Sequence, residues 1–331
     1  MLNSFKLGFP QSWPSGQFET KIIDQFIKKN KFDLVVNTTW SEVKFANTVF
    51  ALENKLELLD KVITNGKNLK CLFYNFVDPL YSNNTYTIIK KAIDKFGGHN
   101  VCCIGYLDTN RVKVKHISFW ALMCEQYFKK YTTEQLIPQN LEKLFLCYNR
   151  KPVYHRKKFI EKCTTERIIE KGFISLGNFD DPTKAITVQN TATHTIRDSG
   201  VSGDVGIPND TMSLGPLDIW NKCLFIIVTE TSHMIDVGSP FTSEKIWKPI
   251  IGLRPFVCLG DNNTHKYLRD NGFHTFNDLL NINDNPYAED IVNGLKKFKQ
   301  EYNSFYQSLK GKLIHNRKRF FEFCKEEQKK I

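Results

Sequence analysis

The sequence predicts an α/β protein made of two doubly wound domains, each with a mostly parallel sheet covered by helices on both faces. Short runs of β-branched and aromatic residues alternate along the chain with longer amphipathic runs, which is typical of this class. The alternation pauses at a polar segment that contains Pro138 and then starts again, so we expect a domain boundary at residue 138. The 331 residues, of which 41% are hydrophobic, are enough to form two cores. We therefore expect two Rossmann-like domains that face each other across a cleft.

The first domain is expected to cover residues 1–138. Strands are predicted where short apolar runs are bounded by polar residues, and helices where apolar residues recur every three or four positions. The predicted strands are 33–37, 69–76, 100–106 and 112–119, and the predicted helices are 46–62, 86–96 and 120–130.

The second domain is expected to cover residues 139–295, followed by a basic helical tail over 296–331. The predicted strands are 144–148, 224–229 and 255–259, and the predicted helices are 154–170, 243–251, 264–271 and 290–329. Residues 177–216 form a long polar stretch, and loops of that length in compact domains usually act as lids or binding loops.

The charge balance bears on possible partners. The 46 Lys and Arg residues outnumber the 35 Asp and Glu residues, which gives a net charge of +11 and allows attraction to phosphates. Residues 295–331 hold 11 basic and four acidic residues, so this tail carries about +7. It is either a solvated helix face or a patch for nucleic acid or a membrane surface. Only nine of the basic residues are Arg, which counts against a protein that reads DNA bases, because Lys lacks bidentate geometry.

Cysteine usage favours a reducing compartment. The nine Cys residues are scattered and include no Cys-x-x-Cys pair, so we expect neither a disulfide framework nor a zinc site. Nothing resembles a signal peptide, and the longest apolar stretch, residues 223–228, is too short to span a bilayer. We expect a cytoplasmic protein without a transmembrane segment.

The segment over residues 240–260 contains the sharpest candidate for a ligand site. Thr242 or Ser243 can cap the helix that follows, and Glu244 and Lys245 occupy its first turn. A helix N-terminus offers backbone N–H groups and partial positive charge to an anion. Lys245 is therefore a candidate for binding a diphosphate, and Glu244 for accepting hydrogen bonds from the sugar hydroxyls of a nucleotide. In the alternative interpretation Glu244 only complements the helix dipole and Lys245 is solvated.

A second candidate lies where a predicted strand runs through a turn at Asn149 into a helix. In α/β sheets, ligands bind beyond the carboxyl ends of strands, where such turns lie. Arg150, His155 and Arg156 cluster there and are candidates for holding a pyrophosphate through charge-assisted hydrogen bonds. The alternative is a basic first turn on a surface helix.

Four segments together carry a resemblance to a known family. They resemble the donor-binding half of GT-B glycosyltransferases. The segments are Asn149 through Arg156, residues 225–231, the Thr-Ser-Glu-Lys-Ile-Trp run at 242–247 and residues 255–260. The pattern is most similar to the α1,3-fucosyltransferase and exostosin-like group, and also to small glycosyltransferases of viruses and phages. The resemblance covers residues 144–276.

This resemblance implies a nucleotide-sugar donor, a UDP- or GDP-sugar, with a role for each matching residue. Arg156 and Lys245 would contact the diphosphate, Glu244 the ribose, and Glu230 the transferred sugar or the nucleotide. The chain departs from the family where Asn-Arg-Lys-Pro stands in place of Asn-Pro and where Thr231 follows Glu230 in place of Asn. The base and the sugar of the donor therefore cannot be carried over.

Metal dependence is not expected. The chain contains no Asp-x-Asp triplet, which metal-dependent glycosyltransferases usually carry. In GT-B chemistry, cationic side chains and a helix N-terminus stabilise the leaving group instead.

An inverting transfer to a hydroxyl needs a general base, which we expect from the N-terminal domain. Glu42, Asp78 and Asp108 each follow a predicted strand and are the candidates, although each also suits a turn. Asp78 is preferred, because it precedes Pro79 and follows an aromatic run that could stack on an acceptor ring.

Three functions remain open from the sequence. The first is a glycosyltransferase acting on a 5-hydroxymethylated pyrimidine of DNA, as in a viral genome, which would use the basic tail and would work in the host cytoplasm. The second is the same chemistry on a glycan or a lipid-linked acceptor. The third is a nucleotide- or nucleic-acid-binding module without catalysis.

Overall fold

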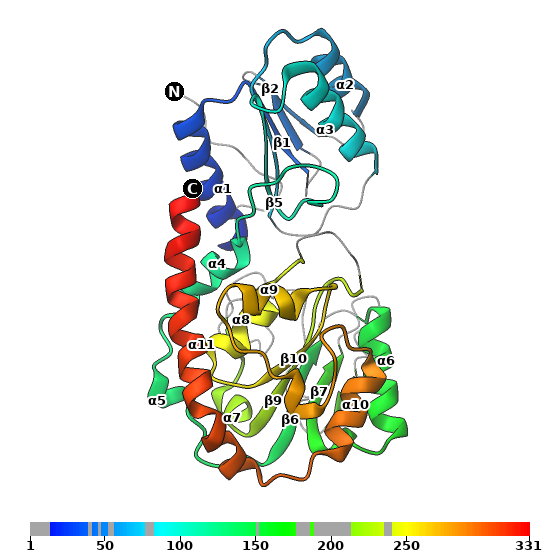
Figure 1. The fold of residues 1–331 in the computed structure, drawn as a ribbon, viewed down its shortest axis with the longest axis vertical. Helices are drawn as coiled ribbons and strands as arrows, with labels where there is room; N and C mark the ends of the chain where they lie inside the picture. Colours follow the sequence, from blue (N-terminus) through cyan, green and yellow to red (C-terminus); the bar gives the residue numbers. More distant parts are fainter. Residues whose placement is uncertain are drawn as a thin grey trace. The chain divides into compact units, whose positions relative to one another are not determined.

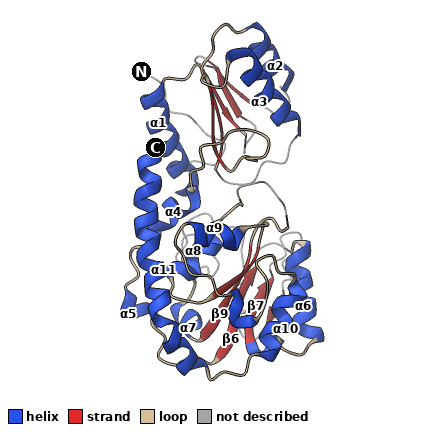
Figure 2. Cartoon of the chain, in the orientation of Figure 1, coloured by secondary structure: helices blue, strands red, loops and turns tan. Residues whose placement is uncertain are grey.

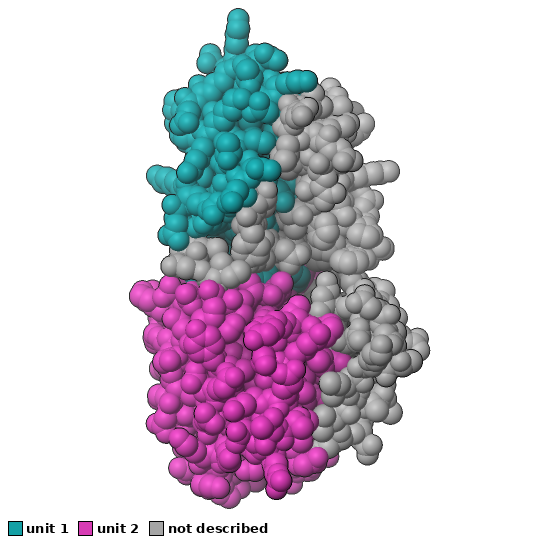
Figure 3. All heavy atoms as spheres, turned by 90° about the vertical axis from the view of Figure 1, so that its right-hand side faces the viewer, with its two compact units in different colours: residues 1–120, 237–241, 327–331 teal, residues 121–236, 242–326 magenta. Residues whose placement is uncertain are grey.

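A computed structural model describes residues 14–38, 42–45, 48–51, 56–76, 83–149, 152–176, 186–188, 213–234 and 240–331 of the chain. By its internal contacts the chain divides into two compact units (Figure 3). Unit 1 comprises Met1–Trp120, Val237–Phe241 and Glu327–Ile331, and unit 2 comprises Ala121–Asp236 and Thr242–Glu326. This division falls at residue 120, whereas the sequence placed a boundary at residue 138.

Unit 1 contains a five-stranded mixed sheet in the order β3-β2-β1-β4-β5. Its strands are β1 (Leu34–Asn37), β2 (Glu42–Phe45), β3 (Thr48–Ala51), β4 (Cys71–Asn75) and β5 (Val101–Gly105). Strands β1, β4 and β5 are parallel, and the β2–β3 hairpin adds two antiparallel strands at the edge. The helices are α1 (Pro14–Asn30), α2 (Leu56–Asn65) and α3 (Asn83–Phe96).

The core of unit 1 lies between its parallel strands and its helices. All five residues of β4 are buried, as expected for a central parallel strand covered on both faces. Leu59 and Ile63 of α2 and Ile89 of α3 belong to the same apolar cluster. At the end of β5, Gly105 has a φ of +89°, and a Cβ there would lie 2.0 Å from the carbonyl oxygen of Asn75, so only glycine fits.

Unit 2 contains a second five-stranded sheet, in the order β10-β9-β6-β7-β8 (Figures 1 and 2). Its strands are β6 (Lys143–Asn149), β7 (Gly172–Leu176), β8 (Ile186–Val188), β9 (Cys223–Thr229) and β10 (Phe256–Leu259). Strands β10, β9, β6 and β7 are parallel, and β8 is an antiparallel edge strand. Its helices are α4 (Phe119–Phe128, which begins in unit 1), α5 (Thr133–Leu136), α6 (Tyr154–Thr165), α7 (Leu217–Asn221), α8 (Glu244–Ile251), α9 (Thr264–Asp270), α10 (Ala288–Lys297) and α11 (Tyr302–Lys330, which ends in unit 1).

Helices cover both faces of the unit 2 sheet. On one face, Phe145 of β6 packs edge-on against Phe159 of α6, with 6.0 Å between ring centroids. On the other face, Leu146 of β6 and Ile226 of β9 lie beneath α8. This alternation along each strand is the arrangement that a doubly wound sheet requires.

The basic C-terminal segment is helical and amphipathic. The apolar side of α11 buries Tyr306, Leu309, Leu313, Phe320 and Phe323. Trp247 of α8 stacks on Phe323, with ring centroids 5.5 Å apart. Most of this segment therefore contributes to the core of unit 2, while Lys312, Lys318, Lys325 and Lys329 are exposed.

The predicted α/β class with parallel sheets is confirmed, and several predicted elements are wrong. The helix predicted over 46–62 is replaced by strand β3 and helix α2, because residues 48–51 pair with β2 as a hairpin. The strand predicted over 112–119 is absent, because residues 112–118 form only an isolated bridge from Lys115 to Ile104 and Phe119 begins α4. Strand β7 was not predicted, and the helix predicted over 154–170 ends at Thr165. The helix predicted over 290–329 is two helices, α10 and α11.

In the part of the chain described here, the structure contains no helix that combines the length and the apolar character of a membrane span.

Candidate functional site

The candidate site lies in unit 2, where parallel strands β6 and β9 end side by side. Strand β6 ends at Asn149 and β9 at Thr229, and both side chains are buried. The hydroxyl of Thr229 donates a hydrogen bond to Oδ1 of Asn149 at 2.5 Å. Parallel strands bring their carboxyl ends to the same edge of a sheet, and loops and helix N-termini meet there. Asn149 thus lies beside the end of β9.

Two residues at the start of α6 bind the backbone at the end of β9. Nη2 of Arg156 donates to the carbonyl oxygens of Thr229 and Glu230, each at 3.0 Å. Nε2 of His155 lies 3.0 Å from the same Glu230 carbonyl oxygen. Arg156 is buried, so in this structure its guanidinium stabilises the strand end.

His155 is a neutral ring at physiological pH. Burial lowers its pKa to about 4, and the nearby Arg156, His233 and Lys245 lower it further. The hydrogen bond to the backbone of Glu230 acts in the opposite direction and raises the pKa. A neutral imidazole offers a hydrogen bond and a flat surface, whereas it offers a phosphate no charge.

Glu230 is the buried anchor of the site. Its carboxylate is fully buried and accepts hydrogen bonds from Ser243, one from the backbone N–H at 3.0 Å and one from the hydroxyl. Ser243 is also the N-cap of α8, because its Oγ accepts from the backbone N–H of Lys245 at 3.3 Å. Glu230 therefore fixes the point at which α8 begins.

The protonation of Glu230 is shifted by its surroundings. Burial raises the pKa of this carboxyl, and the neighbouring Glu244 adds to the rise, while Lys245 and the hydrogen bonds from Ser243 oppose it. The carboxylate thus depends on Lys245 and Ser243 for compensation of its charge.

Lys245 is the cation at the centre of this cluster. Its Nζ lies 3.3 Å from Oε1 of Glu244 and 3.9 Å from Oε2 of Glu230, and it donates to Oγ of Ser243 at 3.0 Å. The side chain of Lys245 is 26% exposed, compared with 9% for Glu244 and 0% for Glu230. Lys245 is therefore the member of the three that an incoming anion would reach first.

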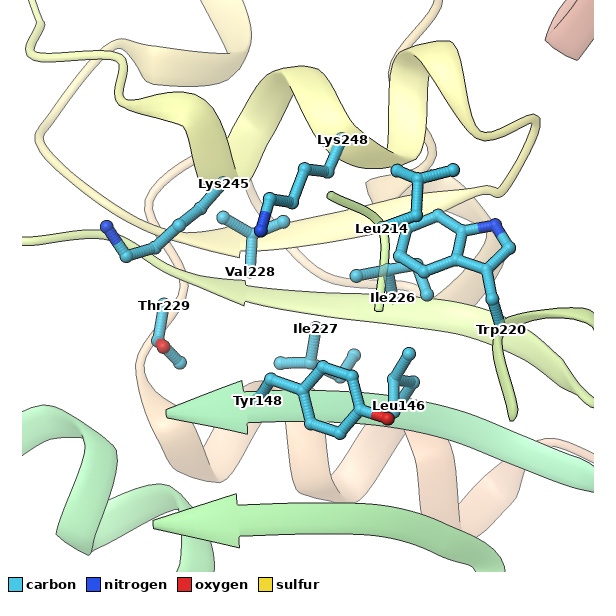
Figure 4. Close-up of a pocket in the computed structure, with 10 residues that line it drawn as sticks. All are labelled: Leu146, Tyr148, Leu214, Trp220, Ile226, Ile227, Val228, Thr229, Lys245 and Lys248. Atoms are coloured by element: carbon cyan, nitrogen blue, oxygen red, sulfur yellow. The ribbon is translucent and has the colours of Figure 1, made fainter. Parts of the chain in front are cut away.

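A pocket adjoins the cluster (Figure 4). Lys245 and Lys248, one turn apart on α8, extend over strands β6 and β9, with Lys245 at the Thr229 end. The remaining lining is mostly apolar and comprises Leu146, Tyr148, Leu214, Trp220, Ile226, Ile227 and Val228. The pocket therefore combines two ammonium groups with an apolar floor.

Most predicted donor-site residues come together here. Those that lie around the ends of β6 and β9 and the start of α8 are Asn149, Arg156, Glu230, Thr242, Ser243, Glu244 and Lys245. Arg150 lies outside the described residues. Lys248 was not predicted, although its spacing of three from Lys245 on a helix was a usable signal.

The three predicted base candidates belong to unit 1. Asp78 lies outside the described residues, and Glu42 is the first residue of β2. Asp108 organises a turn, since its Oδ1 accepts from the backbone N–H of Asn110 at 2.9 Å and its Oδ2 lies 3.0 Å from Nε of Arg111. These contacts match the interpretation of Asp108 as a turn residue.

Sequence reasoning also missed an aromatic contact behind the site. The rings of His155 and His233 stack with centroids 5.2 Å apart and an interplanar angle of 26°. Nothing in the local sequence around His233 marks this contact, because the two residues are brought together only by the sheet.

Among the described residues, no group of three or more His, Cys, Asp and Glu side chains is arranged to hold a metal ion.

No protein-family model, curated protein or solved structure matches this chain. The assignment of the site therefore depends on its geometry and on the resemblance of its motifs.

Proposed function

We propose that unit 2 binds the diphosphate of a UDP- or GDP-sugar and that the protein is a metal-independent glycosyltransferase of the GT-B type. The observation that carries this proposal is the position of Lys245. It lies in the first turn of α8, beside the carboxyl ends of two parallel strands, and is linked to the buried Glu230 through Ser243.

This arrangement suits the departure of a nucleoside diphosphate. When the sugar leaves, negative charge develops on the diphosphate, and a lysine ammonium together with the N-terminus of a helix stabilises it. The anchoring of Ser243 by Glu230 holds the helix terminus in place before the donor arrives, so little reorganisation is needed. In this proposal Glu244 accepts hydrogen bonds from the ribose once Lys245 turns toward the diphosphate.

The acceptor is proposed to be the hydroxyl of a 5-hydroxymethylated pyrimidine in DNA, with a base supplied by unit 1, for which Asp78 is the first candidate. The net charge of +11 supports this, as do the exposed Lys312, Lys318 and Lys325 of α11. Lysines on an exposed helix face attract the phosphate backbone without reading its sequence.

The test is a donor screen with the full chain. Thermal unfolding is followed with UDP, GDP, ADP and CMP, and hydrolysis of the matching nucleotide sugars is then measured with and without hydroxymethylated duplex DNA. We expect stabilisation by one nucleotide and turnover that depends on DNA. Turnover that a glycan or a lipid-linked sugar stimulates in place of DNA would refute the proposed acceptor, and stabilisation without any turnover would refute catalysis. No stabilisation by any nucleotide would refute the donor site itself.

A further inference from the structure

Exposed tyrosines gather at the helix N-termini of unit 2. Among the described residues the large hydrophobic side chains that stand out as exposed are Tyr154 (76%), Tyr287 (59%) and Ile314 (41%). Tyr154 is the first residue of α6, and Tyr287 is the N-cap of α10. These two helices pack against each other. Tyrosine offers a large, rigid contact surface with a polar end, which makes it suited to binding a flat ligand.

One of these tyrosines is connected to the candidate site through a series of rings. Nε2 of His155 lies 3.0 Å from the carbonyl oxygen of Glu230, and the ring of His155 stacks on that of His233. The ring of Tyr287 meets His233 edge-on, with 6.2 Å between centroids and an angle of 78°. The carbonyl oxygen of Pro286 lies 3.3 Å from Nε2 of His233 and holds that ring in place. The series therefore begins at the residue that anchors α8 and ends at an exposed ring.

The series complements the cationic cluster chemically. His155 carries no charge near neutral pH, because burial lowers its pKa to about 4. It therefore does not compete with Lys245 for a phosphate. A nucleoside diphosphate has an anionic end and a flat aromatic end, and the site offers a lysine at one side and stacked rings at the other.

We infer that Tyr287, supported by His233 and His155, stacks on the base of the nucleotide whose diphosphate Lys245 binds. This inference rests on the proposed function and assigns the base to the start of α10. Stacking of a base on an aromatic side chain tolerates either a purine or a pyrimidine, because every base has a π face. The removal of such a ring weakens binding by about tenfold or more.

The test is calorimetric titration of the full chain with UDP, with GDP and with inorganic pyrophosphate. We expect Tyr287→Ala to bind the nucleoside diphosphate about tenfold more weakly and pyrophosphate as tightly as the wild type does. Tyr287→Phe keeps the ring and should bind like the wild type. Tyr154→Ala is the matched control, since Tyr154 is an exposed tyrosine at the start of the neighbouring helix α6, where its ring faces the ammonium group of Lys158. It should leave both affinities unchanged. The backbone N–H of Tyr287 donates to Oδ2 of Asp290 at 2.9 Å and is retained in both variants, so α10 should keep its start.

Two results overturn the inference in distinguishable ways. If the wild type binds neither nucleotide, the proposed function fails and the base site fails with it. If the wild type binds a nucleotide and Tyr287→Ala binds that nucleotide equally tightly, only the stacking role is refuted. The same holds if Tyr287→Ala loses as much affinity for pyrophosphate as it loses for the nucleotide.

Discussion

The buried Glu230 provides a sharp test of how α8 is held. Replacement by Ala leaves the backbone N–H and the hydroxyl of Ser243 without the carboxylate that accepts from them. Each buried donor left without an acceptor costs about 1–3 kcal/mol, and Ser243 has two, so we expect Glu230→Ala to lose about 2–6 kcal/mol of unfolding free energy. Glu230→Gln keeps one acceptor oxygen for the backbone N–H, so only the hydroxyl of Ser243 loses its acceptor, and we expect a smaller loss of about 1–3 kcal/mol.

The pH dependence of this comparison has a defined sign. Because the folded-state pKa of Glu230 is raised above its ordinary value of 4.5, the folded protein binds this proton more tightly than the unfolded chain does. The resulting stabilisation is fully present below the ordinary value and is lost as pH rises through the raised pKa. The wild type should therefore gain stability relative to Glu230→Gln as the pH is lowered from neutral toward 4.5.

Urea unfolding, followed by circular dichroism at several pH values, measures both effects. Equal midpoints and slopes for Glu230→Ala and Glu230→Gln would refute the role of the carboxylate as the acceptor that fixes Ser243. A wild type that loses stability relative to Glu230→Gln on acidification would refute the inferred direction of the pKa shift.

Two further predictions concern stability away from the site. Arg254 is fully buried and donates to the carbonyl oxygens of Cys223 at 3.0 Å and Leu136 at 2.8 Å. We expect Arg254→Met to lose about 3 kcal/mol or more of unfolding free energy, measured by urea unfolding. An unchanged midpoint would refute this prediction. Burial, together with the charge of Lys330, lowers the pKa of His116 from 6.5 to about 4. The stability that the neutral His116 ring contributes is therefore fully present above pH 6.5 and is lost as the pH drops toward 4. The loss should reach up to about 3 kcal/mol in the wild type, and His116→Phe should show a shallower acid dependence, measured as the unfolding midpoint against pH. Identical pH profiles for the two proteins would contradict the burial of a neutral imidazole.

The sequence was most informative where local pattern and tertiary structure agree. Strand β9 is a run of seven buried apolar or small residues, and β4 is similar, so both were predicted from continuous hydrophobicity alone. The start of α8 was predicted from Thr242 or Ser243 as a cap and from Glu244 and Lys245 as first-turn residues, all of which are local signals, and the cap is Ser243.

The errors arose where pairing partners decide the structure. Residues 48–51 contain a helix-compatible apolar pattern and become strand β3 because β2 is available for an antiparallel hairpin. Strand β7 begins with Gly172, whose missing side chain leaves room for Phe145, and its five residues carry no alternation strong enough to indicate a strand. The contact between His155 and His233 joins residues that lie 78 positions apart, and the sequence contains no signal for it.

The most direct test of the donor site is the affinity of Lys245→Met for the nucleoside diphosphate that stabilises the wild type. A charge-assisted hydrogen bond to a phosphate contributes about 1.5–3 kcal/mol, so we expect a loss of about 10- to 100-fold in affinity. Lys266→Met is the matched control, because Lys266 lies in the first turn of α9, is 60% exposed and pairs with Asp270. Calorimetry should show wild-type affinity for Lys266→Met and a weakened affinity for both the nucleotide and pyrophosphate in Lys245→Met. Equal affinity in the two variants would contradict the assignment of the diphosphate to Lys245 and the start of α8.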